Sequence, residues 1–235
     1  MSFLLCLLAL ALPVRAAPAD DLNLAAAADV PTVARQEAFD RLVILGSTDT
    51  GLVTRVAQTE DDDTRKRWVA VRVLGHVGGD GAQATLLGLL KDPQPAIRAA
   101  AVGALGELGK WGNTATLTAM LDDPAIIVRA EAASALAQLG DPTAVPALSK
   151  ALASPGNYHR DTSLWVRKHY VVALGEIGTK DAVPALLRAL DDADPDVAAA
   201  AIPAFEHVGG FSMGEGRNLD QQKEAWRRWA AAQVR

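Results

Sequence analysis

The feature that most constrains this chain is a glycine that returns at nearly constant spacing. Its six copies are separated by 32, 31, 31, 38 and 31 residues, at Gly46, Gly78, Gly109, Gly140, Gly178 and Gly209. Eleven residues before these glycines stand Arg35, Arg67, Arg98, Arg129, Arg167 and, in the sixth copy, Ala198. Six residues further back stand Asp29, Asp61, Asp92, Asp123, Asp161 and Asp192. A fixed period of this length is the signature of a repeat architecture, in which similar units stack in a row.

Each repeat has the pattern of a helical hairpin. Between the arginine and the glycine, apolar residues fall at helical spacing, as Ile97, Ala101 and Leu105 do. A glycine is a natural end for such a helix, and a second apolar segment follows, at 51–59, 82–90, 114–121, 144–152 and 182–190. Because one hairpin cannot bury its apolar face alone, neighbouring hairpins must stack. With 50% hydrophobic but only 5% aromatic residues, we predict an all-α superhelix, a solenoid of about six hairpins.

The recurring aspartate and arginine are predicted to be structural. Asp92-Pro93 and Asp123-Pro124 fit a helix N-cap followed by a proline at the first helical position. The arginine can reach the aspartate of its own repeat or of an adjacent one, and a bidentate pair between repeats would fix their register. Ala198 fits this interpretation, because the last copy has fewer neighbours to join. The alternative is a row of arginines that binds a ligand.

Two segments resemble a known family. Residues 96–109 (AIRAAAVGALGELG) and 181–190 (DAVPALLRAL) are similar to the short HEAT-like repeats first described in phycobilisome lyases. The resemblance covers roughly residues 29–209 and implies an armadillo-type helical superhelix. It implies little about function, because the family includes scaffolds, adaptors and a few enzymes.

The N-terminus has the pattern of a signal peptide. Residues 3–14 form an almost unbroken apolar run that is too short to span a bilayer as a helix. Small residues around Ala16 and Ala19 fit cleavage sites, so we expect a signal peptide at 1–19 and a periplasmic or secreted mature chain without a stable membrane span. No Lys or Arg precedes the run, and failed export or a start further upstream are the alternatives.

Residues 211–235 depart from the repeat, which leaves 20–210 as the predicted solenoid. A glycine-containing loop leads to a helix that carries Trp226 and Trp229 on one face. Terminal repeats of solenoids need a cap with a polar outer face, and we predict a C-terminal capping helix. The alternative is a helix for a membrane surface or a partner. Trp111 and Trp165, at the edges of the first helices, are expected to pack against their neighbours.

Exposed positions on the first helix of each repeat are candidates for partner binding, because these helices are expected to line the concave face. Counted from each arginine, positions +1, +2, +5 and +9 point away from the apolar stripe. One of them is a tryptophan, a residue type enriched at binding hot spots. The candidate partner-binding residues are Trp68, Arg72, His76, Glu131, Lys168, His169 and His207. The alternative is ordinary surface packing.

The interval of 38 residues inserts a polar segment at 154–160. Such an insertion between helices is predicted to be a surface loop. It carries an aromatic ring and an imidazole, so Tyr158 and His159 are further candidates for contact with a partner. A tolerated change of length is the alternative.

The leading functional prediction is a non-catalytic scaffold or adaptor of the cell envelope that binds a protein or peptide on its concave face. The net charge of −5 lacks the basic footprint of a nucleic-acid binder. No nucleophile, phosphate-loop or zinc motif appears, and the only cysteine, Cys6, lies in the apolar run. We therefore expect no cofactor, no metal and no small-molecule ligand.

The alternative is an enzyme or enzyme subunit of the HEAT-like lyase or hydroxylase kind. The resemblance to deoxyhypusine hydroxylases implies iron ligands in His-Glu dinucleotides, whereas this sequence has only the reverse order, in Glu206-His207. A bound metal or chromophore would support this alternative. A purely structural role within an envelope complex also stays open.

Overall fold

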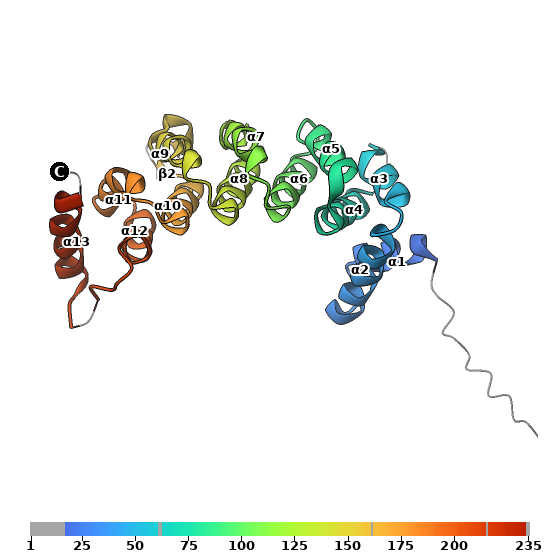
Figure 1. The fold of residues 1–235 in the computed structure, drawn as a ribbon, viewed down its shortest axis with the longest axis horizontal. Helices are drawn as coiled ribbons and strands as arrows, with labels where there is room; N and C mark the ends of the chain where they lie inside the picture. The colour runs from blue at the N-terminus through green and yellow to red at the C-terminus, as the bar shows by residue number, and fades with distance from the viewer. Residues whose placement is uncertain (1–16, 61–62, 161, 215, 234–235) are drawn as a thin grey trace, which may run out of the picture.

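Two rows of helices form a curved array, in which the inner row follows the concave side (Figure 1). This computed structural model describes residues 17–60, 63–160, 162–214 and 216–233. The inner row comprises α2 (Thr32–Gly46), α4 (Thr64–Val77), α6 (Pro95–Glu107), α8 (Ile126–Leu139), α10 (Val166–Ile177) and α12 (Pro195–Gly209). The outer row comprises α3 (Gly51–Gln58), α5 (Gly79–Leu89), α7 (Thr114–Ala119), α9 (Val145–Ala153) and α11 (Val183–Leu190). The predicted all-α superhelix of about six hairpins is confirmed.

The remaining elements lie at the two ends of the array and in its turns. Helix α1 (Pro18–Ala26) packs on α2 and α4, and helix α13 (Leu219–Gln233) packs on α11 and α12. Short 3-10 turns lead into or out of the outer helices: η1 (Trp111–Asn113), η2 (Met120–Asp122), η3 (Pro142–Ala144), η4 (Pro155–Asn157) and η5 (Lys180–Ala182). Strands β1 (Tyr158–His159) and β2 (Thr162–Ser163) pair antiparallel before α10. The predicted signal peptide lies almost wholly in residues 1–16, outside the described residues.

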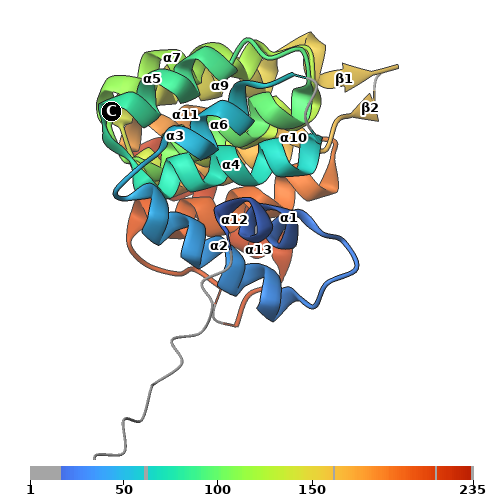
Figure 2. The same ribbon diagram turned by 90° about the vertical axis from the view of Figure 1, so that its right-hand side faces the viewer.

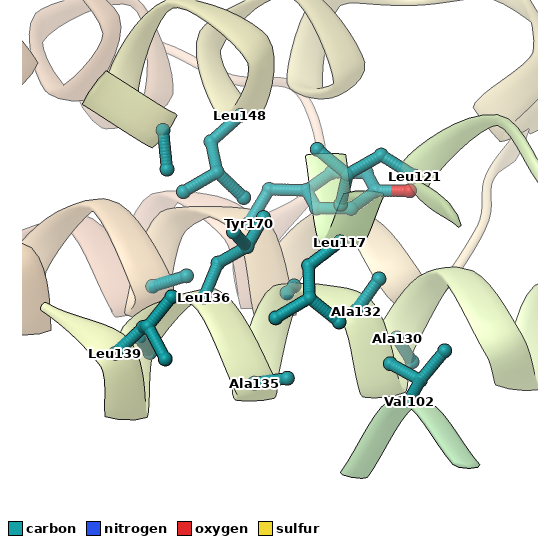
Figure 3. Packing of buried hydrophobic residues seen from close by; sticks show 14 of the residues in the cluster. Val102, Leu117, Leu121, Ala130, Ala132, Ala135, Leu136, Leu139, Leu148 and Tyr170 are labelled. Carbon is teal, nitrogen blue, oxygen red and sulfur yellow. The ribbon is translucent and has the colours of Figure 1, made fainter. Parts of the chain in front are cut away.

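The hydrophobic core runs between the two rows along the whole array. Figure 3 shows one section of it, where side chains from both rows meet. Leu117 of α7 and Leu148 of α9 are fully buried against Leu136 of α8 and Tyr170 of α10. Since these contacts join neighbouring hairpins, the core is continuous although each hairpin contributes only a thin slice of it.

Small residues let the inner helices approach one another closely. A Cβ at Gly106 of α6 would lie 2.7 Å from the Cβ of Ala135 on α8. The same contact recurs between Gly75 and Ala104. Because there is no space for even a methyl group at these glycines, a larger residue there would force the helices apart.

An ion-pair ladder joins the inner helices α4, α6 and α10 to the repeat that follows each of them. The guanidinium of one repeat pairs with the carboxylate 25 residues later in the next repeat, as in Arg67–Asp92, Arg98–Asp123 and Arg167–Asp192. In the middle rung both bonds measure 2.8 Å, from Nε to Oδ2 and from Nη2 to Oδ1. The aspartates of the repeat pattern that follow Arg35 and Arg129 are Asp61 and Asp161, and both lie outside the described residues. The described pairs therefore all run in one direction along the chain.

The ladder aspartates also organise the turn before each helix. Burial raises the pKa of Asp123, but hydrogen bonds from Arg98 and the Ala125 amide, with the charges of Arg98 and Arg129, outweigh it and lower the pKa below its usual value. Arg129 donates to the backbone oxygen of Asp123 at 2.8 Å. Asp92 and Asp123 are thus each bound by two arginines, one from the preceding repeat and one from their own repeat.

The prediction that these aspartates are N-caps with proline at the next position is wrong. Helix α6 begins at Pro95, with Gln94 as its N-cap, and α8 has Ala125 as its N-cap. The carboxylate of Asp92 accepts a hydrogen bond from the Gln94 amide at 2.9 Å, which makes a turn before the helix starts. In the sixth repeat the N-cap of α12 is Asp194, two residues after the ladder aspartate Asp192.

The glycines end the inner helices as predicted in the middle of the array but not at its ends. Gly78, Gly109, Gly140 and Gly178 have positive φ angles, between 63° and 72°. Gly46 is instead the buried last residue of α2, where a Cβ would lie 2.8 Å from Val77. In the last repeat the left-handed residue is Gly210, and Gly209 makes room for the ring of Trp226. At both ends of the array, packing against an atypical neighbour decides which residue ends the inner helix.

Helix α13 closes the C-terminal end of the array, as the predicted cap does. The Trp226 ring is fully buried and stacks between Phe205 of α12 and Phe211, with centroid distances of 5.3 Å to each. Trp229 meets the Trp226 ring edge-on at 5.4 Å. Arg227, between the two tryptophans, pairs with Asp191 on the outer side. One face of α13 therefore covers the last repeat while its charges meet water.

Replacing Arg98 by alanine tests the ladder. The change leaves Asp123 buried without its cation, and we expect the free energy of unfolding to fall by about 3 kcal/mol. Chemical denaturation measures the difference. Lys91→Ala, at an exposed cation nearby, is the control and should change stability by less than about 0.5 kcal/mol. An Arg98 variant as stable as this control would exclude a role in register.

Candidate functional site

A hollow of about 200 Å³ lies on the concave face above helix α6, and we call it the α6 hollow. Its floor has no side chain longer than a methyl group, since it consists of Ala96, Ala99, Ala100, Gly103 and Ala104. Trp68 and Arg72 of α4 form one wall, and Ile127 and Glu131 of α8 form the other, with Glu107 at one end. The hollow exists because α6 carries small residues between two neighbours that carry long ones.

The α4 wall holds a cation between aromatic rings. The Arg72 guanidinium carbon lies 5.0 Å from the Trp68 ring centroid and 5.4 Å from that of Phe39. The His76 ring meets Phe39 edge-on at 5.2 Å, and its Nδ1 lies 3.2 Å from a carboxylate oxygen of Glu107. Trp68 is still 41% exposed, so one large apolar ring remains available on the concave face.

Glu131 is the electrostatically strained member of the site. Burial raises its pKa, the charge of Glu107 raises it further, and the charge of Arg72 acts in the opposite direction. The Glu131 carboxylate lies over Gly103, in the space that a Cβ at this position would need. The absence of a side chain at Gly103 therefore lets a second carboxylate enter the hollow.

A larger hollow, of about 380 Å³, lies on the other side of Trp68. The end of α1 supplies Ala25, Ala26 and the following Ala28, and α4 supplies Thr64 and Arg65. Since Trp68 lines both hollows, its ring is the partition between them. The predicted hot-spot tryptophan thus stands between two hollows.

Lys168 and His169 belong to a separate hollow, of about 340 Å³, between α8 and α10. Ser134 and Gln138 of α8 line its other side. Trp165, which was expected to pack, is 51% exposed and contacts the His169 ring edge-on at 5.0 Å. Trp165 is the N-cap of α10, and its ring is packed only in part, which corrects that expectation.

The remaining predicted residues lie apart from these hollows. Tyr158 and His159 form β1, which projects with β2 from the side of the array (Figure 2). The Arg167 guanidinium covers the Tyr158 ring at 4.3 Å, so this tyrosine partly supports a rung of the ladder. His207 is exposed, and its ring lies beside Gly178. The structure therefore brings together Trp68, Arg72, His76 and Glu131, but not the whole predicted set.

Two residues of the site were not among the candidates. Phe39 supports Arg72 and His76 from α2, and Glu107 contacts His76 and repels Glu131. The +9 spacing that marked His76 also falls on Glu107, so the signal for Glu107 was present in the sequence. For Phe39, which lies inside an apolar pattern, the sequence offers no comparable signal.

The arrangement supplies shape, aromatic surface and charge. Within the described ranges, no group of three or more His, Cys, Asp or Glu side chains is placed to hold a metal ion. No helix in the same ranges is long and apolar enough to cross a membrane. What the hollows offer is a row of concave subsites between neighbouring repeats, each about the size of one or a few side chains.

The profile of HEAT repeats matches residues 52–125, 108–160 and 156–210, which together make up more than half of the chain. The chain belongs to the HEAT repeat family. A search among curated proteins found no match.

Several solved structures share the HEAT-like array. One is the complex of CpcE and CpcF of phycocyanin lyase from Nostoc sp. PCC7120, with 28% identity, a TM-score of 0.58 and coverage of 68% of this chain. The match spans 65% of that lyase chain, so a third of it has no counterpart here. YibA from E. coli matches with 20% identity, a TM-score of 0.56 and coverage of 80% of this chain and 69% of its own. An engineered protein matches with 20% identity, a TM-score of 0.52 and coverage of 83% and 90%.

Glu131→Gln tests the electrostatics of the α6 hollow. A folded-state pKa above the unfolded one means that the ionised carboxylate destabilises the fold at neutral pH. We expect the glutamine variant to be more stable than the parent by a few tenths of a kcal/mol at pH 7. The gain should vanish as the pH falls below the usual glutamate pKa of 4.5, where the parent is protonated in both states.

Thermal unfolding at pH 7 and pH 3.5 measures this difference. Glu176→Gln, at an exposed glutamate on α10, is the matched control and should show no stabilisation. A Glu131 variant that is less stable than the parent at pH 7 would show that the carboxylate is held by favourable contacts instead.

Proposed function

We propose that this HEAT repeat chain is a non-catalytic scaffold or adaptor that binds a protein or peptide on its concave face. The single observation that carries the proposal is Trp68, which is 41% exposed between two hollows and is fixed by Arg72. Tryptophan and arginine dominate binding energy at protein interfaces when they are held in place before the partner arrives. A preformed site of this kind favours affinity, because little side-chain entropy is lost on binding.

Similarity to a protein assembly supports the proposal. CpcE and CpcF were solved as a complex of two proteins, and this chain is similar to that array over 68% of its length. The concave hollows lie between repeats, so a partner that crosses them contacts several repeats at once. Such a surface suits an extended or helical protein segment better than a single small molecule.

We further propose that the chain is exported and acts in the cell envelope. The support is the apolar run at residues 3–14 followed by small residues. Helix α1 begins at Pro18, and its Asp21 is buried and pairs with Arg41 at 2.7 Å. Cleavage after Ala16 leaves this helix whole, whereas cleavage after Ala19 removes its first two residues. Processing after Ala16 is therefore the better fit to the folded chain.

An enzyme or enzyme subunit of the HEAT-like lyase kind is the second candidate. The observation that favours it is the 28% identity to the array named as phycocyanin lyase. Absorption spectra and elemental analysis of the purified chain distinguish the candidates, since a co-purifying chromophore or a stoichiometric metal would favour the enzyme.

Trp68→Ala combined with His169→Ala tests the scaffold. We expect the parent chain to capture a defined protein from an envelope fraction and the double variant to lose it. The reason is that the two hollows beside Trp68 and the hollow beside His169 each lose an aromatic ring. Affinity capture followed by mass spectrometry identifies the partner, and thermal unfolding should give nearly the same melting temperature for both chains.

Lys150→Ala/Arg188→Ala, at exposed positions on the outer helices α9 and α11, is the matched control for loss of surface side chains. Equal capture by parent and tryptophan variant would place the binding site elsewhere. A large fall in the melting temperature of the Trp68 variant would assign that ring to the core.

The mass of the exported chain tests the cleavage site. Intact-mass measurement or N-terminal sequencing of protein from the periplasm or medium should give Ala17 as the first residue. A start at Asp20 would contradict processing after Ala16, and a full-length chain retained in the cytoplasm would contradict export.

A further inference from the structure

We propose that the α6 hollow is a subsite for one lysine or arginine side chain of the partner that crosses the concave face. The inference rests on the proposed scaffold function and adds the chemistry of the bound residue. A volume of about 200 Å³ is below the roughly 300–1,000 Å³ of small-molecule sites. It fits one long side chain that enters between α4 and α8.

The charges that line the hollow favour a cation. Glu107 and Glu131 contribute two carboxylates, and Arg72 contributes one guanidinium. Glu131 is half-buried and is repelled by the charge of Glu107, while the charge of Arg72 acts in the opposite direction. A guanidinium or ammonium inserted here relieves this repulsion and makes charge-assisted hydrogen bonds.

Arg72 does not already fill this role. Its guanidinium lies against the rings of Phe39 and Trp68 on the α4 side. Among the described residues Arg72 forms no ion pair with either glutamate, whereas His76 Nδ1 lies 3.2 Å from a carboxylate oxygen of Glu107. Arg72 thus stiffens the tryptophan wall, and the carboxylates retain acceptor sites.

The floor of the hollow makes the carboxylates accessible. At Gly103 the lack of a Cβ gives Glu131 its position, and the neighbouring alanines expose only methyl groups. The methylene stem of a lysine or arginine packs well on such a floor, because long cationic side chains bury their stems on apolar surface. Trp68 offers its ring beside the same path, which adds an aromatic contact for the cation.

The spacing of the repeats suits an extended segment that carries this side chain. Neighbouring inner helices lie about 8–10 Å apart, and an extended chain advances about 3.3 Å per residue. About three residues of the partner therefore cross one repeat. The residue over α6 enters the hollow, and the segment continues past Ile127, which is 52% exposed, toward α10.

Blocked amino acids test the subsite without a known partner. The probes are Nα-acetyl-arginine amide, its neutral analogue Nα-acetyl-citrulline amide, and the anionic Nα-acetyl-glutamate amide. The readout is the indole N–H signal of Trp68 in ¹⁵N–¹H spectra of the mature chain, assigned with Trp68→Phe. A ligand of this size is expected to bind in the millimolar range.

We expect the arginine probe to shift the Trp68 signal saturably and the citrulline probe to bind at least about tenfold more weakly, as loss of hydrogen bonds to a charged group implies. Glu131→Gln and Glu107→Gln should each weaken arginine binding, while the control Glu176→Gln should not. Equal binding of citrulline, preferential binding of the glutamate probe, or unchanged affinity in the Glu131 variant would overturn the assignment.

Failure here is distinguishable from failure of the scaffold. A chain that captures a protein through Trp68 but ignores the arginine probe keeps its scaffold function and loses this subsite. A chain that binds the arginine probe but captures no protein retains the subsite and loses the proposed partner.

Discussion

The guanidinium of one repeat and the carboxylate of the next form the contact on which the array depends. Each described pair is largely buried, and its aspartate also holds the turn before its own helix. A buried ion pair is only weakly stabilising relative to apolar residues, but it is costly to break and strict in its geometry. Its main effect is therefore to fix the rotation and translation of each hairpin relative to its neighbour. Apolar contacts alone would define these less strictly.

The close packing of small residues and the hollow on the concave face have the same origin. Gly75 and Gly106 let α4, α6 and α8 approach until backbone atoms nearly touch. The same small residues continue onto the exposed side of α6, where nothing fills the space between Trp68 and Glu131. A helix rich in alanine and glycine thus serves tight stacking on one side and leaves a recess on the other.

Much of the fold was predictable because its constraints are periodic. Apolar spacing and recurring glycines give the helices and their number, and the recurring Asp and Arg mark a pair. The sequence cannot choose between the aspartate of the same repeat and that of the next, since both are within reach of Arg98. Helix α1 was missed because its alanine-rich sequence has no clear apolar face, and its anchor, Asp21–Arg41, is a single long-range pair.

The site was predictable only in part, because it depends on distances between repeats. Trp68, Arg72 and His76 follow from helical spacing, but their contact with Phe39 depends on how α2 packs against α4. The strain at Glu131 depends on Glu107 and on the missing side chain of Gly103. Trp165 was expected to pack against its neighbours but is half exposed. Whether a ring at a helix edge is buried depends on the path of the adjoining loop, which helical spacing does not give.

The one-way direction of the ladder has a consequence for how the chain folds. Each described ion pair needs only the next 25 residues to be present. A repeat can therefore form its ion pair as soon as the following repeat has been synthesised. Contacts of such short sequence separation form quickly. If the array forms from its N-terminal end, at most one ladder arginine lacks its aspartate at any time. The sixth repeat, with a buried alanine at this position, ends the process without an unmatched charge. The order of synthesis is thus also an order in which the array can be completed, with α13 as its last step.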